Sequence, residues 1–350
     1  MINESDLNSV WIEKYRPKTL DEIIGHKEII NNLKHLIKSN NLPHLVLYGP
    51  KNTGKTSTAF AIARELYRDS WKSDFTYFNA SDFFKGGKKY IAENKQFMPF
   101  IKTDDPKKIQ KSVIDIFKAV IKEYAGIAPL NADYRIIFID SAESLPHGKQ
   151  GQDAQQALRR IMERYNRTCR FIFSTTQLSK LIPPIRSRCL NLFFSPLLDQ
   201  KKYIKYIADK ENINITEEGI DAIQYYAKGD LAKAINTLQI ATTLESKISE
   251  ETIFEIVSME SPEEKKIKEL INATFNNKFI DAIKLIDTLL QKYGLSGSEI
   301  LKLFHDTILK KYPDQLAKYI KYIADADYNL TKGSKERIQL EHLLLRCMLD

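Results

Sequence analysis

The sequence predicts an α/β domain with a parallel sheet, followed by two all-helical domains. From about residue 42 to 196, short β-branched and aromatic runs alternate with longer stretches of helical period, which is typical of parallel strands joined by helices. After Pro196 the strand patterns stop, and amphipathic helical stretches continue to the end. The length of 350 residues is enough for two or three domains. We therefore expect domains at 1–196, 197–257 and 258–350.

The expected strands are short and almost continuously apolar, so both faces of the sheet should be buried. We place them at 45–48, 75–79, 135–140, 170–174 and 190–194. The segment from about 83 to 108 interrupts this order with clustered lysines and two glycines, and we expect it to be a surface insertion. The main helices expected after the sheet lie at 200–209, 217–227, 231–243, 262–275 and 280–293.

Composition excludes several classes of protein. Hydrophobic residues make up 43% and charged residues 28%, with 13 Gly and 12 Pro, which argues against disorder and collagen. Three widely spaced cysteines and six unpaired histidines predict neither a disulfide framework nor a zinc site. No apolar run approaches the ~20 residues that span a bilayer, and the polar N-terminus does not resemble a secretory signal. We expect a soluble intracellular protein that contacts no membrane, in the nucleus of a eukaryote or the cytoplasm or nucleoid of an archaeon. The net charge of +8 favours a polyanionic partner without establishing one.

A phosphate-binding loop lies between the first expected strand and the next helix. The stretch Gly49-Pro-Lys-Asn-Thr-Gly54-Lys55-Thr56 satisfies the pattern GxxxxGK[ST] in the strand–loop–helix context that this motif requires. Backbone N–H groups of such a loop surround phosphates, Lys55 supplies a cation, and the Thr56 hydroxyl can bind Mg²⁺. We therefore predict ATP and Mg²⁺ as ligands, with a binding set of Gly49, Asn52, Thr53, Gly54, Lys55, Thr56 and Ser57.

Asp140 ends the expected strand 135–140 and is the second predicted Mg²⁺ ligand. In many such ATPases a Glu directly follows this Asp and orients or deprotonates the attacking water. Here the next residue is Ser141, whose neutral hydroxyl cannot act as a carboxylate base. Glu143 stands two residues further on and would have to reach back around a turn. Our hypothesis is that the chain binds ATP well and hydrolyses it poorly on its own.

Several phrases, in their order, resemble the small subunits of replication factor C, the AAA+ clamp loader, and the archaeal type is nearest in wording. Besides the phosphate-binding loop they are Val10-Trp-Ile-Glu-Lys-Tyr-Arg-Pro17, Leu42-Pro-His-Leu45, Asn79-Ala-Ser-Asp82, Ala157-Leu-Arg-Arg160, Ile182-Pro-Pro-Ile-Arg-Ser-Arg-Cys189, Gly229-Asp230 with Lys233-Ala-Ile-Asn236, and Lys335-Glu-Arg-Ile-Gln-Leu340. The resemblance implies a P-loop AAA+ domain, a small helical lid and an all-α collar. It also implies a five-subunit ring with other replication factor C subunits, which loads a sliding clamp of the PCNA type onto primer–template DNA.

The resemblance also assigns roles to single residues. Arg188, in Ser187-Arg188-Cys189, matches the arginine finger that reaches the γ-phosphate of an adjacent subunit. The adenine pocket would be lined by Val10, Tyr15, Arg16 and Ile24. The nearest basic residues for DNA contact are Lys85, Lys88, Lys89 and Lys149, although a solvated lysine-rich loop is the interpretation that we favour for this stretch. The stretch 110–117 loosely resembles a clamp-binding box, but its spacing fits an amphipathic packing helix better.

Three positions depart from the family pattern. Besides Ser141, Thr176 stands where the family commonly has a polar sensor Asn. Ala232 stands where the lid motif Gly-Asp-x-Arg has the arginine that contacts the nucleotide. Together the three departures suggest a site kept for nucleotide binding and ring geometry while its own turnover has weakened.

Two other functions stay open at this stage. The chain could be a non-catalytic AAA+ scaffold subunit whose loop no longer binds nucleotide, or an AAA+ ATPase that remodels another DNA-bound assembly without a clamp. A kinase or GTPase fits less well, because a guanine-reading NKxD segment is missing and the second half is all helical.

Overall fold

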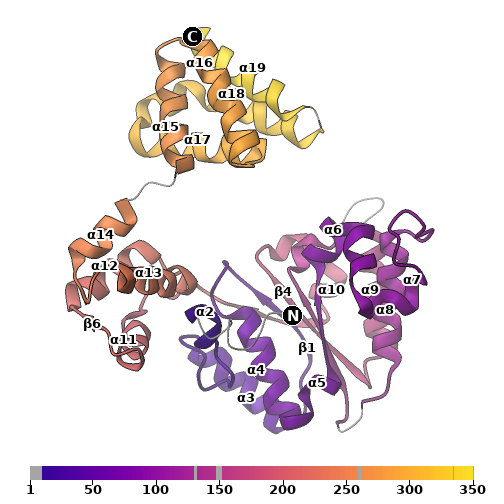
Figure 1. Ribbon diagram of the computed structural model, residues 1–350. Coiled ribbons are helices and arrows are strands. Elements are labelled where there is room, and N and C mark those ends of the chain that lie inside the picture. Colours follow the sequence, from indigo (N-terminus) through magenta and orange to yellow (C-terminus); the bar gives the residue numbers. More distant parts are fainter. Residues whose placement is uncertain (1–9, 130–131, 147–151, 259–261, 334, 350) are drawn as a thin grey trace. The chain divides into compact units, whose positions relative to one another are not determined.

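The structure is a computed structural model that describes residues 10–129, 132–146, 152–258, 262–333 and 335–349. The chain forms two compact units, residues 1–256 and 257–350 (Figure 1). The first unit holds the sheet and the helices up to α14, and the second holds only helices. None of the described helices is long and apolar enough to cross a lipid bilayer.

The first unit is built on a five-stranded parallel sheet of order β2-β3-β4-β1-β5. The strands are β1 His44–Tyr48, β2 Phe75–Asn79, β3 Arg135–Asp140, β4 Cys169–Thr175 and β5 Cys189–Phe193. The predicted parallel sheet is confirmed, with boundaries shifted by one residue at most. Asn79 pairs with Asp140 at the carboxyl ends of β2 and β3, and Tyr48 pairs with Thr175 at those of β1 and β4. These ends form one edge of the sheet, where α/β folds place their ligands.

Side chains of the central strand β3 alternate between two buried clusters, as the period of a strand requires. Ile137 and Ile139 pack on the side of α6 (Ala80–Glu93), α8 (Val113–Gly126) and α9 (Gln152–Arg164). Ile136 and Phe138 pack on the side of α3 (Lys27–Lys38) and α4 (Lys55–Tyr67). All four side chains are fully buried, so both faces of the sheet are covered by helices (Figure 1).

The segment 83–108 is not the exposed insertion that its lysines and glycines suggested. It continues α6, forms the short helices Lys95–Phe97 and α7 (Met98–Ile101), and buries Phe83, Ile91 and Phe97 in the core. The ring of Phe83 lies 4.9 Å from that of Phe78, centroid to centroid. Gly87 explains the misleading pattern, because its φ of +57° interrupts the helical backbone of α6. The prediction of a surface insertion is therefore wrong for the apolar positions of the segment.

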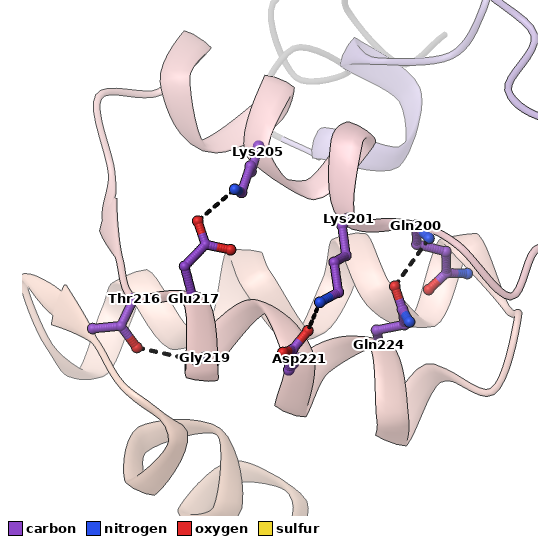
Figure 2. A network of polar contacts seen from close by, with 8 residues as sticks. All are labelled: Gln200, Lys201, Lys205, Thr216, Glu217, Gly219, Asp221 and Gln224. Carbon is purple, nitrogen blue, oxygen red and sulfur yellow. Dashed lines mark hydrogen bonds and ion pairs between the residues drawn. The ribbon is translucent and has the colours of Figure 1, made fainter.

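Four helices follow the sheet within the first unit: α11 Lys201–Lys210, α12 Glu217–Ala227, α13 Leu231–Leu244 and α14 Glu250–Ser258. We call residues 197–256 the lid. Figure 2 shows how its polar side chains join α11 to α12, with ion pairs from Lys201 to Asp221 and from Lys205 to Glu217. The lid also contains a parallel pair of two-residue strands, β6 (Asn214–Ile215) and β7 (Lys247–Ile248). The sequence did not predict them, because two residues carry no periodicity.

The second unit consists of α15 Pro262–Phe275, α16 Phe279–Asp287, a π-helical turn Thr288–Lys292, α17 Gly297–Lys311, α18 Pro313–Thr331 and α19 Glu336–Leu349. Its core includes Ile271, Ile286, Phe304 and Leu344, all nearly fully buried. A capping box between Ser296 and Glu299 starts α17. The predicted all-helical C-terminal domain is confirmed, although the single helix expected at 280–293 changes to π geometry at Thr288.

Candidate functional site

The phosphate-binding loop runs from β1 into α4, and glycine is required at its start. Gly49 has a φ of +144°, and a Cβ there would lie 2.1 Å from the carbonyl oxygen of Phe194. Gly54, with a φ of +94°, immediately precedes the first residue of α4. Any larger side chain at Gly49 would displace the strand end or the loop. The local sequence thus dictates a tight turn that exposes the N-terminal N–H groups of α4.

Lys55 is only 6% exposed, and its ammonium is hydrogen-bonded to neutral oxygens of its own loop. Its Nζ donates to the carbonyl oxygen of Gly49 at 2.9 Å and also to that of Pro50. Within the described residues no carboxylate lies at ion-pair distance from it. Burial lowers the pKa of Lys55, and the more distant charges of Asp140 and Glu143 oppose that shift. A buried cation that is bonded mainly to carbonyl oxygens fits a ligand with anionic oxygens.

Thr56 and Asp140 meet at the sheet edge, where the Thr56 hydroxyl donates to Asp140 Oδ2 at 3.0 Å. A hydroxyl and a carboxylate are hard oxygen donors of the kind that Mg²⁺ prefers. The part of the chain that the structure describes contains no group of three or more His, Cys, Asp or Glu side chains that could hold a metal ion by themselves. The two residues therefore fit a Mg²⁺ ion whose remaining ligands come from phosphate oxygens and water.

A cavity of about 440 Å³ opens beside these residues. Its lining includes all but one of the predicted loop residues, namely Asn52, Thr53, Gly54, Lys55, Thr56 and Ser57, and also Tyr15, Arg16, Ile24 and Asp140. Two predicted residues are not part of the lining. Gly49 packs against the backbone of Phe194 and does not line the cavity. Val10 is 45% exposed at the start of the described chain. The expectation that Val10 lines the pocket is not supported by this geometry.

The lining also contains residues that the sequence did not single out. They are Ile12, Pro17, Ile23, Phe60, Tyr77, Leu197, Tyr203, Leu231 and Ile235. Phe60 could have been found, because it lies three residues after Ser57 on the same helix. The lid residues Tyr203 and Ile235 could not, since nothing local indicates where the lid helices pack. Ala232 lines the cavity with a methyl group at the position of the family's lid arginine.

One hydrogen bond joins the phosphate-binding loop directly to the lid. The side-chain amide of Asn52 donates to Asp230 Oδ2 at 3.1 Å. The other carboxylate oxygen of Asp230 accepts from the backbone N–H of Lys233 and so caps α13. A loop residue and the aspartate of the lid motif are therefore in direct contact.

Neither Ser141 nor Glu143, the two candidate positions for a base after β3, provides a free carboxylate. Ser141 adopts a left-handed conformation, with a φ of +53°, and its N–H donates to Asp140 Oδ1 at 2.9 Å. Both oxygens of Glu143 accept hydrogen bonds from Thr176, which follows β4. Thr176, one of the three departures from the family pattern, is thus hydrogen-bonded to the carboxylate two residues after Ser141, another departure.

Arg188 lies outside the cavity, on the surface between α10 (Pro183–Arg186) and β5. Its guanidinium donates to the carbonyl oxygen of Pro184 at 2.8 Å and to Glu163 Oε1 at 2.5 Å. The side chain is 36% exposed. It contacts no residue of its own phosphate-binding loop.

The predicted DNA-binding lysines have different environments. Lys85 and Lys89 are exposed on α6, whereas Lys88 turns inward and donates to the carbonyl oxygen of Ile109 at 2.7 Å. The geometry therefore disfavours Lys88 as a DNA contact. Lys149 lies outside the described residues. In the stretch 110–117, Ile116 and Phe117 are buried in the core, which confirms the packing-helix interpretation over the clamp-binding box.

Comparisons with known proteins agree with this geometry. The family model for the ATPase family associated with various cellular activities (AAA) matches residues 45–197, and the replication factor C C-terminal domain matches residues 262–346. The replication factor C small subunit of Archaeoglobus fulgidus is 38% identical over 340 residues, which cover 96% of each chain. The chain belongs to the replication factor C small subunit family. The small subunit of Methanocella arvoryzae is 39% identical over 342 residues, which cover 96% of this chain and 95% of that one.

Among solved structures, the RuvB Holliday junction branch migration motor of Thermotoga maritima superposes with a TM-score of 0.52 at 16% identity. The match covers 87% of this chain and 91% of RuvB, and it supports the AAA+ fold alone. The resemblance to replication factor C and the predicted fold class are thus confirmed.

Proposed function

We propose that this replication factor C small subunit binds ATP and Mg²⁺ in its own cavity and supplies Arg188 to the site of a neighbouring subunit. Its turnover of its own nucleotide is slow. In the assembled ring of five subunits it helps to load a sliding clamp onto primer–template DNA. The proposal rests on family membership and on the arrangement of charges around the two sites.

The observation that supports ATP binding is the buried ammonium of Lys55, for which the described residues provide no carboxylate at ion-pair distance. A phosphate would replace the neutral carbonyl acceptors of Lys55 with anionic oxygens, so that donor and acceptor would both be charged. Thr56 and Asp140 are already hydrogen-bonded to each other and would hold Mg²⁺ beside the β- and γ-phosphates. When bound, the ion would neutralise charge on the transferred phosphoryl group.

Slow turnover follows from what surrounds the γ-phosphate position. Ser141 carries no basic group, the carboxylate of Glu143 is bonded to Thr176, and Ala232 cannot reach a phosphate. The chain therefore retains the groups that bind nucleotide and lacks free groups that accelerate its hydrolysis.

Arg188 suits a role in a neighbouring site because it is exposed and weakly held. An exposed ion pair such as Arg188–Glu163 contributes about 0–1 kcal/mol, so exchanging Glu163 for a phosphate costs little. The planar guanidinium can then make two parallel hydrogen bonds to phosphate oxygens. Arginine fingers supplied in trans accelerate hydrolysis by about 10³- to 10⁵-fold.

Two measurements test this proposal. Equilibrium binding of ATP to the purified chain should be lost in Lys55→Ala; no binding by the unmodified chain would favour the non-catalytic scaffold. In the complex with its partner subunits, Arg188→Ala should reduce ATP turnover more than Lys55→Ala does. The reverse ranking would mean that the chain hydrolyses its own nucleotide.

Copurification with a sliding clamp and clamp-loader partners tests the assembly itself. DNA affinity of the complex should fall steeply with salt, because phosphate contacts release counterions. A complex without a clamp would instead favour an AAA+ ATPase that remodels another assembly.

A further inference from the structure

Residues 10–17, which we call the arm, are joined to the lid by several hydrogen bonds. The backbone N–H of Trp11, the first residue of α2 (Trp11–Lys14), donates to Gln239 Oε1 at 3.2 Å. The hydroxyl of Tyr203, on α11, donates to the backbone oxygen of Tyr15 at 2.7 Å. Tyr15 also meets the ring of Tyr206 edge to face at 6.3 Å. The arm therefore contacts both α11 and α13 of the lid.

Glu211 is the centre of this contact. It directly follows α11, and its Oε1 accepts from the ammonium of Lys14 and from the hydroxyl of Tyr15, each at 2.5 Å. The Glu211 side chain is 19% exposed. Burial alone raises the pKa of Glu211, but the hydrogen bonds from Lys14 and Tyr15 outweigh it and lower the pKa overall. Both side-chain donors to this charged carboxylate come from the arm.

The contact determines where one wall of the nucleotide cavity lies. Tyr15 and Tyr203 both line the cavity, whereas Glu211 is not part of the lining. Glu211 therefore acts on the cavity only through the residues that it holds. Because residue 232 is an alanine, the lid has no cationic side chain at the family's phosphate-contacting position. Hydrogen bonds from the arm therefore supply much of the polar contact that holds the lid beside the cavity.

We propose that Glu211 is a positioning residue, which joins the arm and the lid into one wall of the cavity and so sets the affinity for the part of the nucleotide remote from the γ-phosphate. This inference rests on the proposed function, because it concerns the same ATP site. It adds a residue that contacts neither the loop nor the metal position. Loss of Glu211 should lower the affinities for ATP and for ADP by the same factor. Loss of Lys55 should instead lower the affinity for ATP more than the affinity for ADP.

The test is calorimetric titration of the full chain with ATP and with ADP. Glu211→Gln keeps the size of the side chain and removes its charge. We expect both affinities to fall about tenfold, equivalent to about 1.4 kcal/mol. The matched control is Glu217→Gln, which breaks the ion pair with Lys205 within the lid (Figure 2) and should leave both affinities unchanged. The double variant Lys14→Glu with Glu211→Lys restores opposite charges and should recover part of the loss.

Three outcomes would overturn the inference. They are unchanged affinity in Glu211→Gln, an equal loss in Glu217→Gln, which would indicate general weakening of the lid, or a loss confined to ATP.

Hydrogen exchange in the absence of nucleotide separates this inference from the proposed function. The backbone N–H groups of Lys14 and Tyr15 donate to the carbonyl oxygens of Val10 and Trp11, which closes the single turn of α2. They should exchange faster in Glu211→Gln and at the unmodified rate in Glu217→Gln. If the unmodified chain bound no nucleotide, the proposed function would fail. Unchanged hydrogen-exchange rates of Lys14 and Tyr15 in Glu211→Gln would refute the role of Glu211 in the arm–lid contact, whether or not the chain binds nucleotide.

Discussion

Glu143 and Thr176 are joined by two hydrogen bonds across neighbouring strand ends. The Thr176 hydroxyl donates to Glu143 Oε1 at 2.9 Å, and the Thr176 N–H donates to Glu143 Oε2 at 3.2 Å. The carboxylate that follows β3 is therefore oriented by the loop that follows β4. Since residue 141 is a serine with a neutral hydroxyl, a carboxylate base for the attacking water is missing at the family's usual position.

Restoring a carboxylate at position 141 should increase hydrolysis. We expect Ser141→Glu to raise ATP turnover at this site at least tenfold, because a positioned general base contributes about 10²- to 10⁴-fold and the left-handed backbone at 141 costs part of that gain. The measurement is single-turnover hydrolysis in a complex whose other phosphate-binding lysines are substituted. Ser141→Gln, of equal size and uncharged, should give no increase. Equal rates in the two variants would contradict the explanation of slow turnover.

Arg188→Ala should lower the ATP turnover of the complex and leave the stability of the chain almost unchanged. Because its ion pair with Glu163 is exposed, the free energy of unfolding measured with urea should change by less than about 1 kcal/mol. Turnover of the assembled complex should fall more than tenfold, since a trans arginine contributes far more than that to phosphoryl transfer. A matching loss of stability would mean that the turnover defect reports unfolding and not a missing guanidinium.

Phe83→Ala tests whether segment 83–108 belongs to the core. The Phe83 side chain is fully buried, with the rings of Phe78, Phe97 and Phe117 around it at 4.9, 5.2 and 6.0 Å. Its truncation should lower the free energy of unfolding by about 3–5 kcal/mol. Lys85→Ala, on the exposed side of the same helix, should change it by less than about 0.5 kcal/mol. A small change in the free energy of unfolding for Phe83→Ala would indicate that the segment lies on the surface and not in the core.

His44 should make the first unit less stable in mild acid. Burial, with a smaller contribution from Arg170, lowers the pKa of His44 to about 4, and its Nδ1 accepts from the N–H of Phe171 at 3.0 Å. The unfolded chain binds this proton near pH 6.5 and the folded chain only near pH 4, so stability is lost as the pH falls through that window. The full loss is up to about 3 kcal/mol.

Urea midpoints at pH 7.5, 6 and 5 measure this dependence. His44→Gln retains an acceptor for the Phe171 N–H and cannot be protonated in this range. It should therefore show a flatter pH profile than the unmodified chain. Identical slopes would assign the acid sensitivity to other groups.

Features that depend on local pattern could be predicted from the amino-acid sequence. Continuous apolar runs located all five strands of the sheet, because a parallel strand buried on both faces admits few polar residues. The loop motif located Lys55 and Thr56, since only certain residues at fixed spacing can make that turn. Asp140 followed from its place at the end of β3.

Tertiary structure decided the features that join distant parts of the chain. The Tyr15–Glu211 bond spans 196 positions and the Asn52–Asp230 bond 178, and no periodicity links such pairs. The burial of Phe83 was hidden by neighbouring lysines that point to solvent from the same helix. Sequence pattern indicates which face of each helix or strand is buried. Which other element covers that face depends on how the elements pack together. The walls of the cavity are formed by that packing, so the pattern could not predict them.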